Sequence, residues 1–176
     1  MTMDEIAFQK ALDAAFRFLS PRPRSILEVR QRLRRRGLEP EETEEVVAWL
    51  QEREFVDDMA FANFWIENRE SFRPRARRMI EQELRQRGVN PQALEARLET
   101  VDEEASAARA AGKKAQSLAS HNYATFTARI GGLLRRRGFS YEIVSRVTRR
   151  LWTEVTSGSA ERSGRPGHPD GEDGQD

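Results

Sequence analysis

The chain has 176 residues, of which 38% are hydrophobic and 34% charged, and its formal net charge is +1. It contains no cysteine, which excludes disulfides and thiolate chemistry, and it has no run of the roughly 18 apolar residues that a membrane span needs. This composition favours a thin core shared among small helical units over one deep core. The first ten residues lack the apolar run of a signal peptide, so we expect a soluble, cytoplasmic protein.

Helices are expected throughout the chain, because apolar residues show no convincing period-two alternation. A capping box from Ser25 to Glu28 is expected to open the first arginine-rich helix, and Pro74 to have a similar role in the second. The other helices are expected to cover 6–19, 40–52, 58–69, 91–101, 103–119 and 141–155, and one arginine-rich helix is expected to end just before each of Gly37, Gly88 and Gly138.

These three glycines belong to one phrase that occurs three times. Leu33–Leu38 reads Leu-Arg-Arg-Arg-Gly-Leu, and close copies stand at Leu84–Val89 and Leu134–Phe139. The spacing of about 50 residues indicates repeated supersecondary units. Each glycine is expected to end its helix in the left-handed region, and the apolar residue after it to pack back onto that helix.

Four positions, counted from each glycine, are apolar in all three copies. The first two of them are four residues apart and share one helix face. The positions are Val29, Ile80 and Ile130; Leu33, Leu84 and Leu134; Leu38, Val89 and Phe139; and Leu50, Val101 and Leu151. We therefore predict an all-α fold of three tandem three-helix, helix-turn-helix-like repeats over 1–54, 55–102 and 103–155, followed by a disordered acidic tail, rich in glycine and proline, over 156–176.

Positive charge in this chain comes almost entirely from arginine, whose planar fork suits phosphates and carboxylates. A GC-rich coding sequence would also produce such an excess, so the placement of the arginines is the better evidence. Any one of them is explained by a solvated helix face, but recurrence at matched positions favours a surface that follows a polyanion. The candidate binding residues are Arg22, Arg24, Arg34, Arg35, Arg36, Arg69, Arg73, Arg75, Arg77, Arg78, Arg85, Arg87, Arg135, Arg136 and Arg137.

Other candidate sites are few. No nucleophile motif, phosphate loop or metal-spaced ligand set occurs, so the sequence predicts no catalytic residue, no metal and no cofactor. The pair Asp57–Asp58 is better explained as a helix cap with a first-turn anion than as a metal site. We expect Trp65 to be a core residue. Phe72 fits the core and a base-stacking role equally well.

Three segments resemble the RecX regulatory proteins of bacteria. They are Arg22–Ser25 before the first arginine-rich helix, the stretch Phe55–Ala62 (Phe-Val-Asp-Asp-Met-Ala-Phe-Ala), and Arg69 with 73–78. The resemblance extends over Ala11–Val155. It implies an elongated, curved body of three three-helix units that has no enzymatic activity. It also implies binding to RecA and to the RecA filament on single-stranded DNA, with suppression of ATPase, strand exchange and coprotease activity in recombination and DNA repair.

Two other functions stay open at this point. A helical module of this kind could bind DNA directly without RecA, or it could be a scaffold for another protein. We expect a monomer in each case. The tail, with a net charge of −3 beside a body of +4, could compete with DNA for the arginines, although an inert linker explains it more simply.

Overall fold

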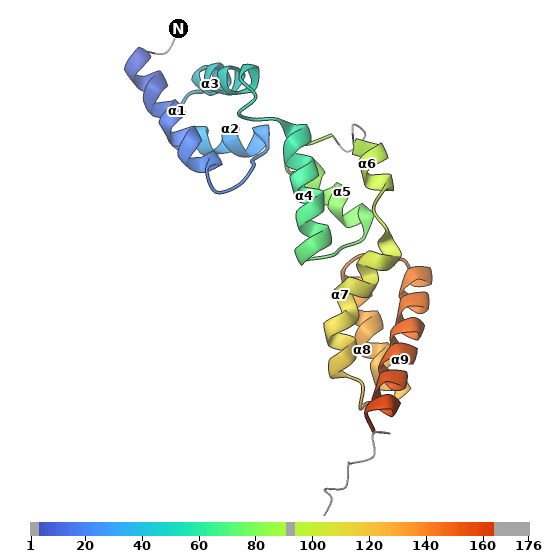
Figure 1. Ribbon diagram of the computed structural model, residues 1–176. Coiled ribbons are helices and arrows are strands. Elements are labelled where there is room, and N and C mark those ends of the chain that lie inside the picture. The colour runs from blue at the N-terminus through green and yellow to red at the C-terminus, as the bar shows by residue number, and fades with distance from the viewer. Residues whose placement is uncertain (1–3, 91–93, 164–176) are drawn as a thin grey trace, which may run out of the picture. The chain divides into compact units, whose positions relative to one another are not determined.

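The computed structural model describes residues 4–90 and 94–163, which form nine helices and no strand (Figure 1). The predicted all-α fold is therefore confirmed. The helices follow one another in three groups of three. They are α1 (Glu5–Leu19), α2 (Ile26–Arg34), α3 (Pro40–Glu52), α4 (Asp58–Phe72), α5 (Arg77–Gln86), α6 (Glu95–Glu99), α7 (Glu103–Ser117), α8 (Tyr123–Arg136) and α9 (Tyr141–Ser163).

The ends of α2, α5 and α8 have the same geometry. Gly37, Gly88 and Gly138 have φ values of 90°, 78° and 89°, in the left-handed region that glycine enters without steric cost. After each glycine the next residue donates its N–H to the leucine carbonyl five residues back, as Leu38 does to Leu33 at 3.4 Å. This is the Schellman ending predicted from the repeated phrase.

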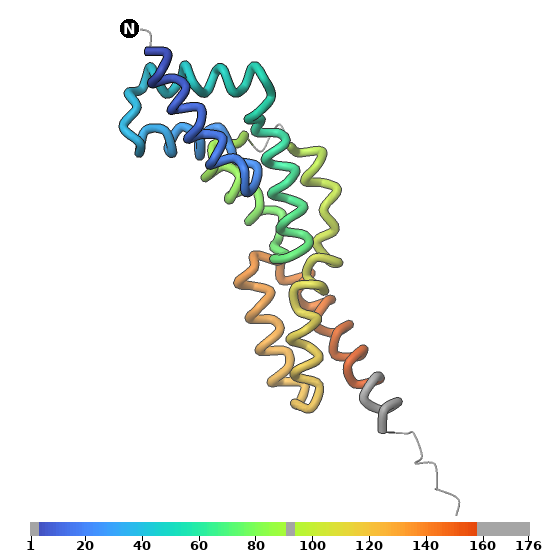
Figure 2. Tube along the Cα trace, turned by 60° about the vertical axis from the view of Figure 1, so that its left-hand side comes forward, coloured from blue at the N-terminus to red at the C-terminus, as the bar shows by residue number. Residues whose placement is uncertain are grey.

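The described residues divide into two compact units, one up to Ser106 and one from Ala107 onward. Figure 2 traces α1 to α6 in the first unit, which holds two apolar cores. One core gathers α1, α2 and α3 around Val29, Leu33 and Leu50. The other gathers α4, α5 and α6 around Phe61, Ile80 and Leu84. Since each core draws on three short helices, the burial is shared as the composition suggested.

The second unit packs α8 against α9, with small side chains along α7. Ala107, Ala111 and Ala115 recur every fourth residue on α7 and are fully buried. Phe126 on α8 meets Trp152 on α9 edge to face, with the ring centroids 5.0 Å apart. Of the twelve repeat positions predicted to be apolar, eleven are buried; the exception, Leu38, is half-buried.

Several predicted helix boundaries are wrong. The helix α4 continues to Phe72, past the predicted end at Arg69. The helix α5 begins at Arg77 and not at Pro74, and its N-cap Ala76 has no capping side chain of its own. The helix α6 covers only Glu95–Glu99 within the predicted 91–101, of which 91–93 lie outside the described residues. The helix α9 continues to Ser163, past the predicted end at Val155, because no proline stops it before Pro166. The rest of the predicted tail, 164–176, lies outside the described residues.

No helix within residues 4–90 and 94–163 is both long and apolar enough to cross a bilayer.

Candidate functional site

The candidate arginines fall into two groups that the sequence did not separate. Eight have exposed side chains, and they stand mainly at the glycine-capped helix ends and around the start of α5. They are Arg34, Arg35, Arg36, Arg73, Arg78, Arg85, Arg135 and Arg136. The other seven are half-buried: Arg22, Arg24, Arg69, Arg75, Arg77, Arg87 and Arg137. Exposed guanidinium groups can reach a polyanion, whereas most of the half-buried ones have partners within the fold.

Three of the exposed arginines, Arg34, Arg135 and Arg136, show how loosely such side chains are held by the chain itself. Arg34 lies 3.8 Å from Glu44, and both side chains are about half exposed, so the pair adds little stability. Arg135 and Arg136 lie along their own helix, where each guanidinium passes close to a glycine one turn earlier, Gly131 and Gly132. Positive charge at a helix C-terminus is favourable to the helix dipole, so these positions are compatible with a stable fold.

Arg22 and Arg24 precede α2, where cations oppose the helix dipole. Arg22 compensates by donating two hydrogen bonds to Glu28, at 2.8 and 3.1 Å, and Arg24 donates to the Phe18 carbonyl at 3.0 Å. Burial raises the pKa of Glu28, but hydrogen bonds from Arg22 and from the Ser25 backbone outweigh it and leave that pKa below its usual value. The predicted capping box of Ser25 and Glu28 is confirmed.

A buried carboxylate, Glu83, organises the second repeat. Its side chain is 11% exposed and accepts hydrogen bonds from Trp65 Nε1 at 2.7 Å, Arg69 Nε at 2.6 Å and Arg75 Nη1 at 2.7 Å. Because a buried carboxylate is costly without partners, these two arginines are needed by the fold. Arg87 lies over the Trp65 ring at 3.8 Å and donates to the Glu83 carbonyl.

Two carboxylates, at the first residues of α4 and α7, cap the start of an earlier helix. Asp58 Oδ1 accepts a hydrogen bond from the backbone N–H of Ile26, the first residue of α2, at 2.8 Å. Glu103 Oε1 accepts from the backbone N–H of Arg77, the first residue of α5, also at 2.8 Å. This second contact explains why α5 needs no cap from Ala76 or Pro74. Burial raises the pKa of Asp58, and the Ile26 hydrogen bond works against that rise.

Three further predicted residues have clear positions. Asp57 caps α4 by accepting from the N–H groups of Met59 and Ala60, as its sequence position suggested. Trp65 is buried, as expected of a core residue, and its indole N–H is paired with Glu83. Phe72 is 78% exposed at the end of α4, so it is not a core residue. No group of three or more potential metal-binding side chains occurs within residues 4–90 and 94–163.

Sequence reasoning missed Glu83, Asp58 and Glu103 as organising residues. For Glu83 a signal was present, because it directly precedes the buried Leu84 and a core tryptophan needs a partner for its N–H. For Asp58 and Glu103 the only signal was that each begins a helix at the start of a new repeat. An acidic residue at that position predicts a favourable interaction with the dipole of its own helix, but it does not predict a hydrogen bond to a helix of the preceding repeat.

Comparison with known proteins identifies relatives of most of the chain. Residues 11–58, 57–98 and 102–148 match the first, second and third three-helix domains of RecX. The Regulatory protein RecX of Streptomyces coelicolor is 30% identical over 149 residues, which is 83% of this chain and 79% of that protein. That of Thermobifida fusca is 32% identical over 148 residues, which is 82% of this chain and 80% of that protein.

Solved structures share the fold. The crystal structure of RecX from Lactobacillus salivarius aligns with a TM-score of 0.67 and 22% identity, over 82% of this chain and 96% of that one. A second crystal structure of a regulatory protein RecX aligns with a TM-score of 0.67 and 19% identity, over 84% of this chain and 80% of that one. The three domain matches and the relatives of 30% and 32% identity show that the chain belongs to the RecX family of regulatory proteins.

Proposed function

We propose that this chain is a non-enzymatic regulator of RecA. It binds the RecA filament on single-stranded DNA and lowers its ATPase, strand-exchange and coprotease activities, acting as a cytoplasmic monomer in recombination and DNA repair. Family membership supports the regulatory role, because the relatives are named regulatory proteins. The proposal also takes the three helical groups as its functional units, with boundaries near residues 54, 102 and 155.

The observation that carries the proposal is the recurrence of exposed arginines within the three residues before each left-handed glycine. Arg34, Arg35 and Arg36 precede Gly37, Arg85 precedes Gly88, and Arg135 and Arg136 precede Gly138. A single solvated arginine needs no function, but the same feature at three matched helix ends suits a partner that is itself repetitive and negatively charged. A nucleoprotein filament has both properties, and contacts repeated along it would raise the avidity.

The half-buried arginines have a different place in this proposal. Arg69 and Arg75 hold Glu83, and Arg22 holds Glu28, so these side chains shape the surface that carries the exposed group. Arg24, Arg77, Arg87 and Arg137 are also half-buried. We assign direct contact with DNA or RecA to the eight exposed arginines, together with the exposed ring of Phe72 beside Arg73, which is free to stack on an unpaired base.

Co-sedimentation tests the proposal against direct DNA binding. Purified protein is spun with RecA filaments on single-stranded DNA, and separately with the same DNA alone, at physiological salt. A RecA regulator is pelleted at lower concentration by the filament than by the bare DNA. Equal affinity for both would favour the DNA-binding alternative, and no affinity for either would favour the scaffold. Salt dependence alone does not discriminate, because phosphates contribute in both cases.

A further inference from the structure

The end of α3 has a Schellman geometry with glutamate in the place of glycine. The N–H of Glu54 donates to the Gln51 carbonyl and the N–H of Phe55 to the Leu50 carbonyl, both at 2.9 Å. Glu54 has a φ of 59° and is the only non-glycine residue with positive φ among those that the structure describes. Three other helices use glycine at this position, and a side chain there is energetically unfavourable. Such an outlier points to a role for the side chain itself.

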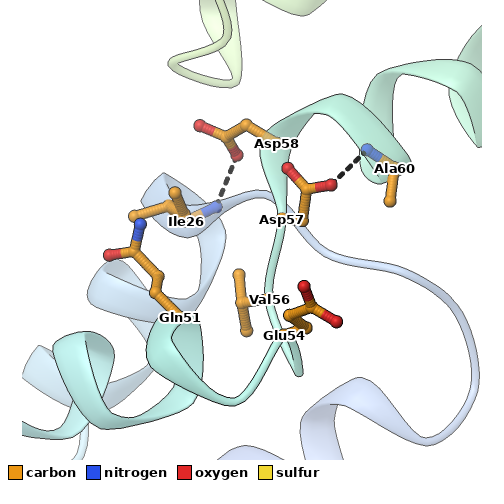
Figure 3. Close-up of a pocket in the computed structure, with 7 residues that line it drawn as sticks. All are labelled: Ile26, Gln51, Glu54, Val56, Asp57, Asp58 and Ala60. Atoms are coloured by element: carbon orange, nitrogen blue, oxygen red, sulfur yellow. Dashed lines mark hydrogen bonds between the residues drawn. The ribbon is translucent and has the colours of Figure 1, made fainter.

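The Glu54 side chain lines a pocket of about 540 Å³ between the end of α3 and the start of α4 (Figure 3). Ile26 and the buried Val56 supply apolar surface in this pocket, and Gln51 supplies an amide. Asp57 and Asp58 add two more carboxylates to the lining. The pocket therefore combines an apolar surface with negative charge, which suits a side chain that has an aliphatic stem and a cationic head.

Two exposed apolar side chains belong to the same segment. Phe55 is 50% exposed and Met59 is 41% exposed. Phe55 is held in place on its inner side, because its ring stacks on Trp49 at 6.0 Å and meets Phe16 edge to face at 4.9 Å. A ring that is already fixed loses little conformational entropy when a partner covers it. We call Glu54, Phe55, Asp57 and Met59 the α3–α4 corner.

Charge indicates what kind of partner fits this surface. Residues 39–58 contain nine acidic residues and one basic residue, Arg53, whose guanidinium lies over the Trp49 ring at 4.2 Å. Phosphates would be repelled by such a segment, whereas a basic protein segment would be attracted. The exposed arginines show the opposite preference. The two surfaces thus suit different chemical partners.

We propose that the α3–α4 corner is a protein-docking site that takes a lysine- or arginine-bearing segment with an adjacent apolar side chain. The cationic head enters the pocket toward Glu54 and Asp57, its stem lies along Val56, and the apolar neighbour covers Phe55 and Met59. This inference rests on the proposed function only in taking the RecA filament as the partner. It separates a protein contact at the corner from a nucleic-acid contact at the exposed arginines.

Four variants test the inference in filament and bare-DNA binding assays. Glu54→Gly relieves the backbone strain and removes the carboxylate, Glu54→Gln removes only the charge, and Phe55→Ala removes the exposed ring. Tyr141→Ala is the control, because Tyr141 is an 81% exposed aromatic residue on α9, far along the chain. We expect each corner variant to weaken filament binding roughly tenfold, the equivalent of about 1.4 kcal/mol, with binding to bare DNA unchanged. Glu54→Gly should at the same time raise the thermal midpoint.

Three results would contradict the docking-site inference. The inference is wrong if Glu54→Gly melts at a higher temperature and binds the filament like the wild type. It is also wrong if Phe55→Ala loses bare-DNA binding, which would make the corner a nucleic-acid surface. The inference is also contradicted if the Phe55→Ala variant has a lower sedimentation coefficient than the wild type. That result would mean that the wild type self-associates through the corner.

A peptide probe keeps the inference separate from the proposed function. A short peptide that alternates lysine and leucine is titrated into the full chain, and the amide signals of Glu54 and Phe55 are followed by NMR. We expect these signals to shift in the wild type and not in Glu54→Gln. If the wild type ignores the filament but shows these shifts, the RecA proposal fails and the docking site stands. If the peptide shifts neither signal, the docking site fails whatever the filament assay gives.

Discussion

The backbone N–H of Ile26 donates a hydrogen bond to Oδ1 of Asp58 at 2.8 Å, across 32 residues of sequence. The first residue of α2 is thereby capped by the first residue of α4. The N–H of Arg77 and the carboxylate of Glu103 form the equivalent contact at 2.8 Å. Successive three-helix groups are thus tied by the same rule, in which the carboxylate that begins one group satisfies the helix start of the group before it.

Replacement of Asp58 tests this rule. Asp58→Ala leaves the Ile26 N–H without its acceptor and should lower the free energy of unfolding by about 1 kcal/mol, the usual effect of losing a cap. Asp58→Asn keeps an acceptor oxygen and should cost clearly less. Urea denaturation measures the difference, and amide exchange at Ile26 locates it. Equal stability of the alanine variant and the wild type, with Ile26 still protected, would show that the contact is dispensable.

Gly88 and Gly37 form a matched pair for measuring a close backbone approach. Both have positive φ, but a Cβ at Gly88 would lie 2.9 Å from Leu27 Cβ, whereas nothing lies within 4 Å at Gly37. Gly37→Ala should cost about 1 to 2 kcal/mol from backbone strain alone. Gly88→Ala should cost more, because Leu27 must also move. Thermal unfolding of both variants tests this order.

A double variant provides the control for Gly88. Leu27→Gly removes both atoms that a Cβ at Gly88 would meet most closely, Leu27 Cβ at 2.9 Å and Cδ2 at 3.1 Å. The combined cost should therefore be smaller than the sum of the two single costs. Strict additivity would mean that Leu27 and Gly88 are not energetically coupled.

Glu83 is a buried carboxylate that joins three side chains of the second repeat. It holds Trp65, Arg69 and Arg75 through its two carboxylate oxygens, and its replacement leaves two arginines without their anion. Glu83→Ala should lower the free energy of unfolding by roughly 3 to 5 kcal/mol. Glu81→Ala, on the same helix and half-buried, is the control and should cost much less. Circular dichroism during urea unfolding separates them, and similar losses would contradict a central role for Glu83.

The stability of the fold should depend on pH through Glu28. Its pKa in the folded chain lies below the ordinary value of 4.5, so the folded state favours the ionised form. The stabilisation it provides is complete above pH 4.5 and is lost as the pH falls through the folded-state pKa. Glu28→Gln should therefore show a constant deficit at neutral pH that shrinks below pH 4.5. A deficit that stays constant down to pH 3 would exclude this linkage.

The features of the fold that the sequence predicted correctly are those set by residues close together in the chain. The three glycine-capped ends and the buried leucines follow from short-range rules, so their positions could be read from one repeated phrase. The Glu83 network and the Asp58 cap depend on which residues meet between helices. The sequence therefore placed Arg69 and Arg75 beside Arg73 as equal candidates, and only the structure shows that the first two hold a buried carboxylate. In the same way, nothing in the sequence marked Glu54 as the residue at a left-handed helix end.

The most direct test of the central claim is the rate of RecA-driven ATP hydrolysis on single-stranded DNA, with this protein added at substoichiometric amounts. The account predicts that the wild type lowers the rate, and that Arg35→Gln with Arg36→Gln, or Arg135→Gln with Arg136→Gln, restores much of it. Lys113→Gln with Lys114→Gln removes equal charge from exposed positions on α7 and should inhibit like the wild type. No slowing by the wild type, or equal slowing by all three double variants, would contradict it.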